Sequence, residues 1–175
     1  MPPGATILAF GDSLTFGTGA AESQSYPAAL ERLIGRPVVR SGVPGEVSSA
    51  GLSRLPGVLA EAQPKLLILI HGGNDLMRRL DERQTASNVS AMARLARERG
   101  IEVLLLGVPK PGLVLSAPSF YGEIAKSLGL AYDSDTLPGI LKDNALKSDL
   151  AHPNALGYAR LAESIARRLR KAKAI

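Results

Sequence analysis

Short apolar runs alternate with longer amphipathic segments along the chain. Five runs are rich in β-forming residues and bounded by Gly, Pro, Asn or Asp, which is typical of strands. They lie at residues 6–10, 37–40, 65–71, 102–108 and 130–132. The residues at 66–70 are apolar throughout, as expected for a parallel strand that is covered on both faces. The pattern therefore predicts five strands, most of them buried.

Between these runs, apolar residues recur at the spacing of a helix. Leu52, Leu55 and Leu59 fall on one helical face, and Gln63-Pro64 ends that segment. The predicted helices cover residues 26–34, 48–62, 85–99 and 119–128, followed by a last helix that carries Pro153 in its first turn. Residues 133–151 are expected to be irregular or only partly helical.

The regular alternation of strands and helices predicts an α/β fold. A parallel sheet with helices on both faces gives a three-layer α/β/α sandwich. Five strands fit a flavodoxin-like order with the first strand central and with right-handed crossovers. No repeat or linker interrupts the pattern, and 175 residues are enough for one core, so we expect a single domain over residues 1–175.

Composition excludes several kinds of chemistry. The chain has no cysteine, which rules out disulfides, thiolate metal sites and a cysteine nucleophile. Two histidines and an aromatic content of 4% argue against a histidine-rich metal site and against base-stacking platforms for nucleic acid. The net charge of +5 is concentrated near the C-terminus, where Arg160, Arg167 and Lys171 share one helical face. We interpret that face as solvated, in preference to a site for nucleic acid or lipid headgroups.

No segment predicts insertion into a membrane. The apolar run at 66–70 is far too short to span a bilayer, so we expect no integral membrane contact. The first ten residues lack a charged leader, a long apolar stretch and a cleavage site. We therefore expect a cytoplasmic protein, and a secretory leader already removed from the chain is the alternative.

Polar, glycine-rich loops follow the first three predicted strands. They are Gly11-Asp12-Ser13, residues 42–45 and Gly72-Gly73-Asn74-Asp75. Because the carboxyl ends of parallel strands share one edge, we expect these loops to converge. Ser13 also begins a helix, where backbone N–H groups and the helix dipole stabilise an alkoxide and the oxyanion that follows. In the alternative interpretation, Asp12 and Ser13 are ordinary helix caps.

A fourth polar group lies near the C-terminus. Asp149 and His152 are three residues apart, so within one helical turn the carboxylate can reach the imidazole Nδ1–H. The other ring nitrogen is then free to accept a proton from a hydroxyl group. His71 is the only other histidine, and it ends an apolar strand without an acid at an orienting distance in sequence. We interpret His71 as a neutral side chain that is satisfied by hydrogen bonds.

These four blocks, in this order, resemble the SGNH (GDSL-type) hydrolase superfamily over nearly the whole chain. The similarity is to its bacterial arylesterase, thioesterase and lysophospholipase branch. The resemblance implies that Ser13 is the nucleophile and that Asp149 and His152 complete the triad. It also implies an oxyanion hole made by the backbone N–H groups of Ser13 and Gly45 and the side-chain amide of Asn74. Esterase or thioesterase activity without any cofactor or metal follows from the same resemblance.

The second block departs from the family pattern. Arg40 stands where the family usually has Asn, and Pro44 directly precedes Gly45. Pro44 fixes one backbone dihedral and can help to aim the Gly45 N–H, but Gly42 stays a rival for that role. Asn74 has an alternative interpretation as a turn residue after the two glycines.

The predicted substrate is a small acyl ester or thioester. We expect a serine esterase for short to medium acyl chains, with thioesters and lysophospholipids as possible substrates. Residues proposed for an acyl groove are Leu76, Met77, Leu80, Leu113, Val114 and Leu115, and core or loop packing is the alternative for them. One rival is a carbohydrate acetylesterase of the same fold. The other is a non-catalytic flavodoxin-like module, although no GxxxxGK[ST] loop is present.

Overall fold

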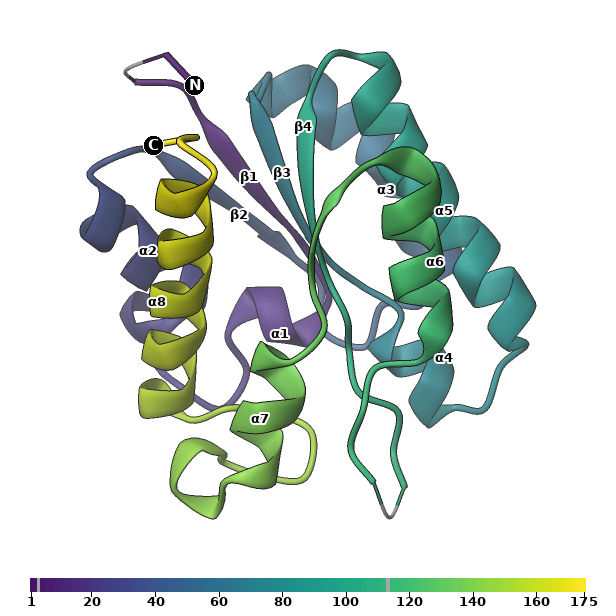
Figure 1. The fold of residues 1–175 in the computed structure, drawn as a ribbon. Helices are drawn as coiled ribbons and strands as arrows, with labels where there is room; N and C mark the ends of the chain where they lie inside the picture. Colours follow the sequence, from purple (N-terminus) through teal and green to yellow (C-terminus); the bar gives the residue numbers. More distant parts are fainter. Residues whose placement is uncertain (3, 113) are drawn as a thin grey trace.

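Five parallel strands form one sheet between two layers of helices (Figure 1). The computed structural model describes residues 1–2, 4–112 and 114–175. The strands are β1 (Ile7–Gly11), β2 (Val38–Gly42), β3 (Leu66–Ile70), β4 (Glu102–Leu106) and β5 (Ala131–Asp133). Every residue of β1 and β3 is buried, which explains why their sequences are apolar runs without alternation.

The strand order is β2-β1-β3-β4-β5, as the flavodoxin-like pattern predicts. The prediction that the first strand is central was wrong, because β3 occupies the middle of the sheet and β1 lies second. The chain leaves β1 toward one side to form β2 and then crosses to the other side to form β3. The carboxyl end of β1 is therefore a topological switch point, where α/β sheets open a crevice for ligands.

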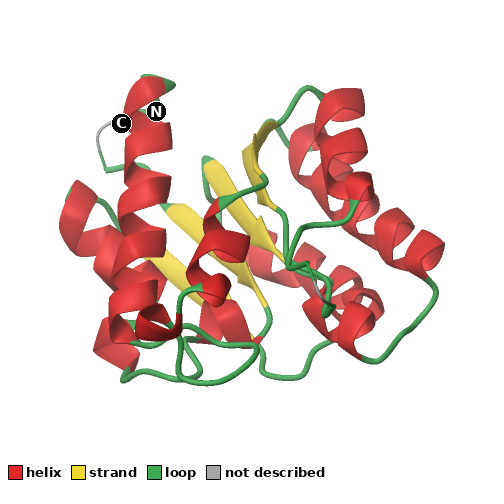
Figure 2. Ribbon diagram, turned by 60° about the horizontal axis from the view of Figure 1, so that its bottom comes forward, coloured by secondary structure: helices red, strands yellow, loops and turns green. Residues whose placement is uncertain are grey.

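Helices cover both faces of the sheet (Figures 1 and 2). The α-helices are α1 (Ser13–Phe16), α2 (Tyr26–Ile34), α3 (Ser48–Ala62), α4 (Gly73–Met77), α5 (Glu82–Glu98), α6 (Ser119–Leu128), α7 (Thr136–Lys142) and α8 (Ala155–Lys171). Two 3-10 turns add Glu22–Gln24 and Asn144–Leu146. Helices α2 and α8 pack together on one face, and α3, α5 and α6 cover the other. Their apolar sides and the sheet form one contiguous core.

The last helix begins later than the sequence predicts. Asn154 is its N-cap, and its side-chain oxygen accepts a hydrogen bond of 3.0 Å from the N–H of Gly157. Pro153 therefore precedes the helix instead of lying in its first turn. None of the helices in the described ranges has the length and apolar character needed to cross a bilayer.

Candidate active site

Ser13 lies at the carboxyl end of β1, as the first residue of the short helix α1. Asp12 caps this helix, since its Oδ1 accepts a hydrogen bond from the N–H of Leu14 at 3.1 Å. A side chain at Gly11 would collide with the carbonyl group of Ile70, and one at Gly42 would collide with the backbone of α1. Both glycines thus let α1 pack tightly against the sheet. The result is a serine that is only 8% exposed and fixed in place by the core.

His152 reaches Ser13 from the loop before α8. Its Nε2 lies 3.0 Å from the Ser13 Oγ, and its Nδ1 lies 2.8 Å from the Asp149 Oδ2. A carboxylate accepts hydrogen bonds, so the ring proton lies on Nδ1 and Nε2 is free to accept from the Ser13 hydroxyl. The structure thus brings these three predicted residues into one chain of hydrogen bonds.

A turn, and not a helix, sets the spacing of Asp149 and His152. The Asp149 Oδ1 accepts hydrogen bonds from the backbone N–H groups of Ala151 and His152, at 2.7 and 2.8 Å. This arrangement closes the loop around the carboxylate. The prediction that both residues lie in one turn of the last helix was therefore wrong, although their contact was foreseen.

The hydrogen bonds keep the Asp149 carboxyl ionised. Partial burial raises its pKa, but hydrogen bonds from the His152 ring and from the N–H groups of Ala151 and His152 outweigh this effect. The pKa of Asp149 consequently lies below its ordinary value. A charged carboxylate beside Nδ1 stabilises the protonated form of the imidazole when it accepts a proton from serine.

Asn74 joins the loops that follow three strands. It lies in α4 directly after β3, where Gly72 adopts a left-handed conformation with φ 100°. The Asn74 Nδ2 donates to the carbonyl oxygen of Glu46 at 3.0 Å and to the Asp12 Oδ2 at 3.3 Å. Burial raises the pKa of the Asp12 carboxyl. Asn74 is thus held at the edge of the sheet next to the residue that precedes Ser13.

The second glycine-rich loop forms a tight turn at Gly45. The N–H of Glu46 donates to the Val43 carbonyl at 3.2 Å, and Gly45 has φ 77°. Pro44 at the second position and a positive φ at the third are the features of a type II turn. The backbone N–H groups of Ser13 and Gly45 have no acceptor within the described part of the chain. Gly42, the rival donor, instead ends β2 and packs against α1.

A cavity of about 360 Å³ opens beside Ser13, Asn74 and His152. Its wall is mostly apolar and includes Leu14, Met77, Val108, Pro109, Pro111, Leu115, Leu141, Leu150 and Ala151. Met77 and Leu115 therefore lie where acyl-groove residues are expected, whereas Val114 does not line the cavity. Leu76 is buried at 4% exposure, Leu80 is 47% exposed, and neither lines this cavity. Leu113 lies outside the described residues.

Several wall residues were missed by the sequence interpretation, among them Val108 and Leu141. Val108 closely follows β4, so the rule that ligands bind beyond the carboxyl ends of strands was sufficient to find it. Leu141 comes from α7, within a segment predicted to be irregular or only partly helical, and no signal in the sequence pointed to Leu141 itself. Within residues 1–2, 4–112 and 114–175, no cluster of three or more His, Cys, Asp or Glu side chains has a geometry that could hold a metal ion.

A parallel-sheet sandwich with serine, histidine and aspartate in hydrogen-bond contact at the sheet edge is typical of SGNH hydrolases. The sequence matches the GDSL-like lipase/acylhydrolase family over residues 9–160, and the chain belongs to this family. It is an esterase or acylhydrolase.

Relatives with assigned activities extend over most of the chain. Esterase TesA of Pseudomonas aeruginosa is 32% identical over 171 residues, covering 91% of this chain and 85% of the relative. Thioesterase 1/protease 1/lysophospholipase L1 of Escherichia coli is 28% identical, covering 94% and 83%. The crystal structure of TesA superposes with a TM-score of 0.85 at 31% identity, over 95% of this chain and 98% of that one. The SGNH-hydrolase family esterase AlinE4 gives a TM-score of 0.73 at 29% identity, covering 98% of both chains. These comparisons confirm the predicted family and fold class.

Proposed function

We propose that this protein is a serine esterase that cleaves short to medium acyl esters through an acyl-enzyme intermediate. Ser13 is the nucleophile, His152 is the general base and acid, and Asp149 orients the imidazole. The observation that carries the proposal is the 3.0 Å contact between the Ser13 Oγ and the His152 Nε2, with Asp149 bound on the opposite side of the ring. Residues 1–175 form one SGNH hydrolase domain in this proposal.

The reaction proceeds by two acyl transfers. His152 takes the hydroxyl proton as the Ser13 Oγ attacks the acyl carbonyl, and the carbon–oxygen double bond opens to an oxyanion. When the oxyanion collapses, His152 gives this proton to the leaving alcohol or thiol. Water then repeats the sequence: His152 accepts its proton, the hydroxide attacks the acyl carbon, and the free acid leaves as Ser13 regains a proton.

The oxyanion is stabilised by three N–H donors in this scheme. They are the backbone N–H groups of Ser13 and Gly45 and the amide of Asn74. The Asn74 amide contacts Asp12 at 3.3 Å and Glu46 at 3.0 Å. The contact to Asp12 is the longer one, so we expect the oxyanion to replace it while the contact to Glu46 is kept.

The cavity wall supports an acyl chain as the group that occupies it. Val108, Leu115, Leu141 and Leu150 offer apolar surface within reach of Ser13, whereas an acetylated sugar requires polar partners. Thioesters and lysophospholipids also carry an acyl group, and the Escherichia coli relative is named for both activities, as a thioesterase and a lysophospholipase. A carbohydrate acetylesterase is the alternative, and a steep preference for acetyl over longer acyl esters would reveal it.

Covalent labelling tests the proposal directly. We expect an alkyl p-nitrophenyl phosphonate to add one phosphonyl group at Ser13, detected by mass spectrometry of the digested protein, and to abolish hydrolysis of p-nitrophenyl butyrate. Ser13→Ala should take up no label and show no turnover, while its melting temperature stays close to that of the wild type. An active Ser13→Ala protein would end the proposal. If the wild-type protein took up no label and showed no turnover, the alternative of a non-catalytic, flavodoxin-like binding module would be favoured.

A further inference from the structure

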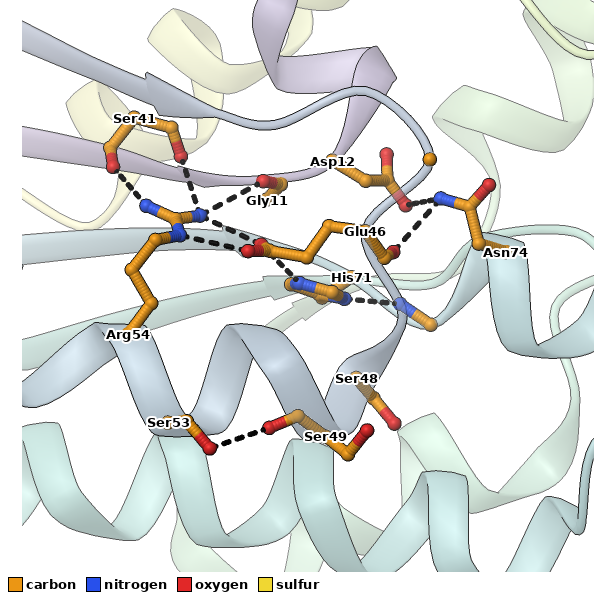
Figure 3. Close-up of polar contacts among 12 residues, drawn as sticks. Gly11, Asp12, Ser41, Glu46, Ser48, Ser49, Ser53, Arg54, His71 and Asn74 are labelled. Atoms are coloured by element: carbon orange, nitrogen blue, oxygen red, sulfur yellow. Dashed lines mark hydrogen bonds and ion pairs between the residues drawn. The ribbon is translucent and has the colours of Figure 1, made fainter.

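A buried carboxylate lies directly behind the proposed oxyanion hole, and the mechanism above does not use it. The Glu46 side chain is only 6% exposed although it belongs to a loop. Arg54 of α3 donates from Nε to Oε1 at 2.9 Å and from Nη2 to Oε2 at 2.8 Å. His71, at the end of β3, lies 3.1 Å from the same Oε2 through its Nε2 (Figure 3).

The protonation of His71 follows from its second contact. The N–H of Gly72 donates to the His71 Nδ1 at 2.9 Å, so Nδ1 carries no proton. The ring proton lies on Nε2 and is donated to Glu46. The sequence interpretation of His71 as a neutral, hydrogen-bonded side chain agrees with this geometry. It missed the acid that orients the ring, because Glu46 lies 25 positions away.

Arg54 ties this cluster to the sheet. Its Nη1 donates to the Ser41 Oγ at 2.6 Å, and its guanidinium lies 4.1 Å from the centre of the Phe10 ring. Burial raises the pKa of Glu46, but hydrogen bonds from His71 and Arg54 outweigh this effect and lower it to about 2. The Glu46 carboxylate is therefore charged at any pH at which an esterase is assayed, and it is clamped from two elements.

The backbone of Glu46 binds the Asn74 amide and closes the turn that contains Gly45, the two donors of the proposed oxyanion hole outside Ser13. Its carbonyl oxygen accepts from the Asn74 amide at 3.0 Å, and its N–H closes the turn that contains Gly45. We propose that Glu46, clamped by Arg54 and His71, is a positioning residue that holds the Gly45 N–H and the Asn74 amide in place for the oxyanion. This inference rests on the proposed function of the site.

The cluster acts through the backbone and does not touch the substrate. Glu46, Arg54 and His71 are absent from the wall of the cavity in the described part of the chain. An oxyanion hole works because its donors are fixed before the charge develops. A displacement of about 1 Å can cost about 10²-fold in rate, so a loosened Glu46 should lower kcat more than it changes substrate binding.

The test compares Glu46→Gln with Asp133→Asn. The Asp133 side chain is fully buried and paired with Arg168 at 2.7 Å, yet it does not line the cavity in the described residues. Both variants remove one buried charge from an ion pair and should lower the melting temperature. We expect Glu46→Gln to reduce kcat on p-nitrophenyl butyrate by about 10²-fold with KM within about threefold, and Asp133→Asn to keep the wild-type kcat.

A double-mutant cycle with Asn74→Ala identifies the route of the effect. If Glu46 acts by positioning Asn74, Glu46→Gln should lower kcat by a much smaller factor in the Asn74→Ala protein than in the wild type. The inference would be overturned if Glu46→Gln lowered kcat by the same factor in both proteins. It would also be overturned if the Glu46→Gln protein were destabilised but kept the wild-type kcat. Arg54→Lys keeps the charge but loses the two-point clamp, so it provides the same measurement if Glu46→Gln does not fold. An active Ser13→Ala protein would instead refute the proposed function.

Discussion

The His152 Nε2 lies 3.0 Å from the Ser13 Oγ, although the two residues are 139 positions apart. The contact depends on how α8 docks beside α2. Tyr158, one turn into α8, is fully buried and donates from its hydroxyl to the carbonyl of Thr18 at 2.7 Å. The packing of α8 therefore places the His152 imidazole at the carboxyl end of β1.

Asp149→Asn tests the proposed role of Asp149 as the acid of the triad. An amide cannot balance the charge of the imidazolium, and it can favour the wrong ring tautomer, so we expect kcat to fall by about 10³-fold or more. Asp143→Asn is the matched control, because Asp143 only caps a 3-10 turn through the N–H of Ala145. The measurement is hydrolysis of p-nitrophenyl butyrate at neutral pH. A loss below tenfold in Asp149→Asn would remove Asp149 from the triad.

The pH profile should show one protonation on its acid side. Because hydrogen bonds hold the pKa of Asp149 below its ordinary value, this carboxylate stays charged as the pH falls from 7 toward 5. The proton that stops catalysis is then the one gained by the imidazole. We expect log(kcat/KM) to fall with a slope of about one on the acid side. A slope of two, or a flat profile from pH 5 to 9, would contradict a histidine base paired with an ionised aspartate.

Glu46 should make the stability of the fold depend on pH in acid. Its pKa is about 2 in the folded protein and 4.5 ordinarily, so the folded state binds fewer protons between these values. Its contribution is fully present above about pH 4.5 and is lost as the pH falls toward 2. We expect Glu46→Gln to melt below the wild type at pH 6 and close to it at pH 2. If the difference in melting temperature between the two proteins stayed constant from pH 6 to pH 2, the charge of Glu46 would not be the cause of the lower stability.

Val108→Phe tests whether the cavity holds the acyl chain. Val108 is 5% exposed and lines the cavity beside Ser13, so a larger side chain should fill space that a long acyl group needs. We expect the kcat/KM ratio of p-nitrophenyl octanoate to acetate to fall by at least about tenfold. Acetate hydrolysis is the internal control, because it uses the same triad. An unchanged ratio would place the acyl chain elsewhere.

Two glycines of α3 should respond in opposite ways to alanine. A Cβ at Gly51 would collide with the buried ring of His71, whereas a Cβ at Gly57 would meet no atom within 4 Å. We expect Gly51→Ala to lower the free energy of unfolding by about 2 kcal/mol. Gly57→Ala should be neutral or stabilising by up to about 1 kcal/mol, because alanine favours the helix. Urea unfolding measures both, and equal effects would contradict the close packing at Gly51.

The sequence predicted the strands and the loops at their ends well, because both follow from local rules. Buried parallel strands must be apolar, and their carboxyl ends must share an edge, so the meeting of Ser13, Gly45 and Asn74 loops could be foreseen. Asp149 and His152 were found through their short spacing. The helix assigned to them was wrong, because the Asn154 cap and the turn around Asp149 depend on individual hydrogen bonds.

The side-chain contacts of His71 and Glu46 were beyond the reach of the sequence. His71 follows β3, Glu46 lies in the loop before α3, and Arg54 lies in α3, so no single segment of the sequence shows that they meet. Short helices such as α1 and α4 contain too few residues to show a period. The cavity wall combines residues from several elements, among them Leu141 of α7, in a segment that was predicted to be irregular or only partly helical. Such features require the packed fold.

The proposed nucleophile, Ser13, and the proposed base, His152, lie in parts of the molecule with different local stability. Ser13 is buried at the start of α1, which packs closely against the sheet at Gly11 and Gly42, whereas Asp149 is 55% exposed and its neighbour Leu150 is 88% exposed. Surface turns open at a lower free energy than the core strands beneath them. On warming, the turn that carries Asp149 and His152 should therefore open first, and activity should be lost while the sheet is still folded. Because the core would survive such an opening, the lost activity should return on cooling.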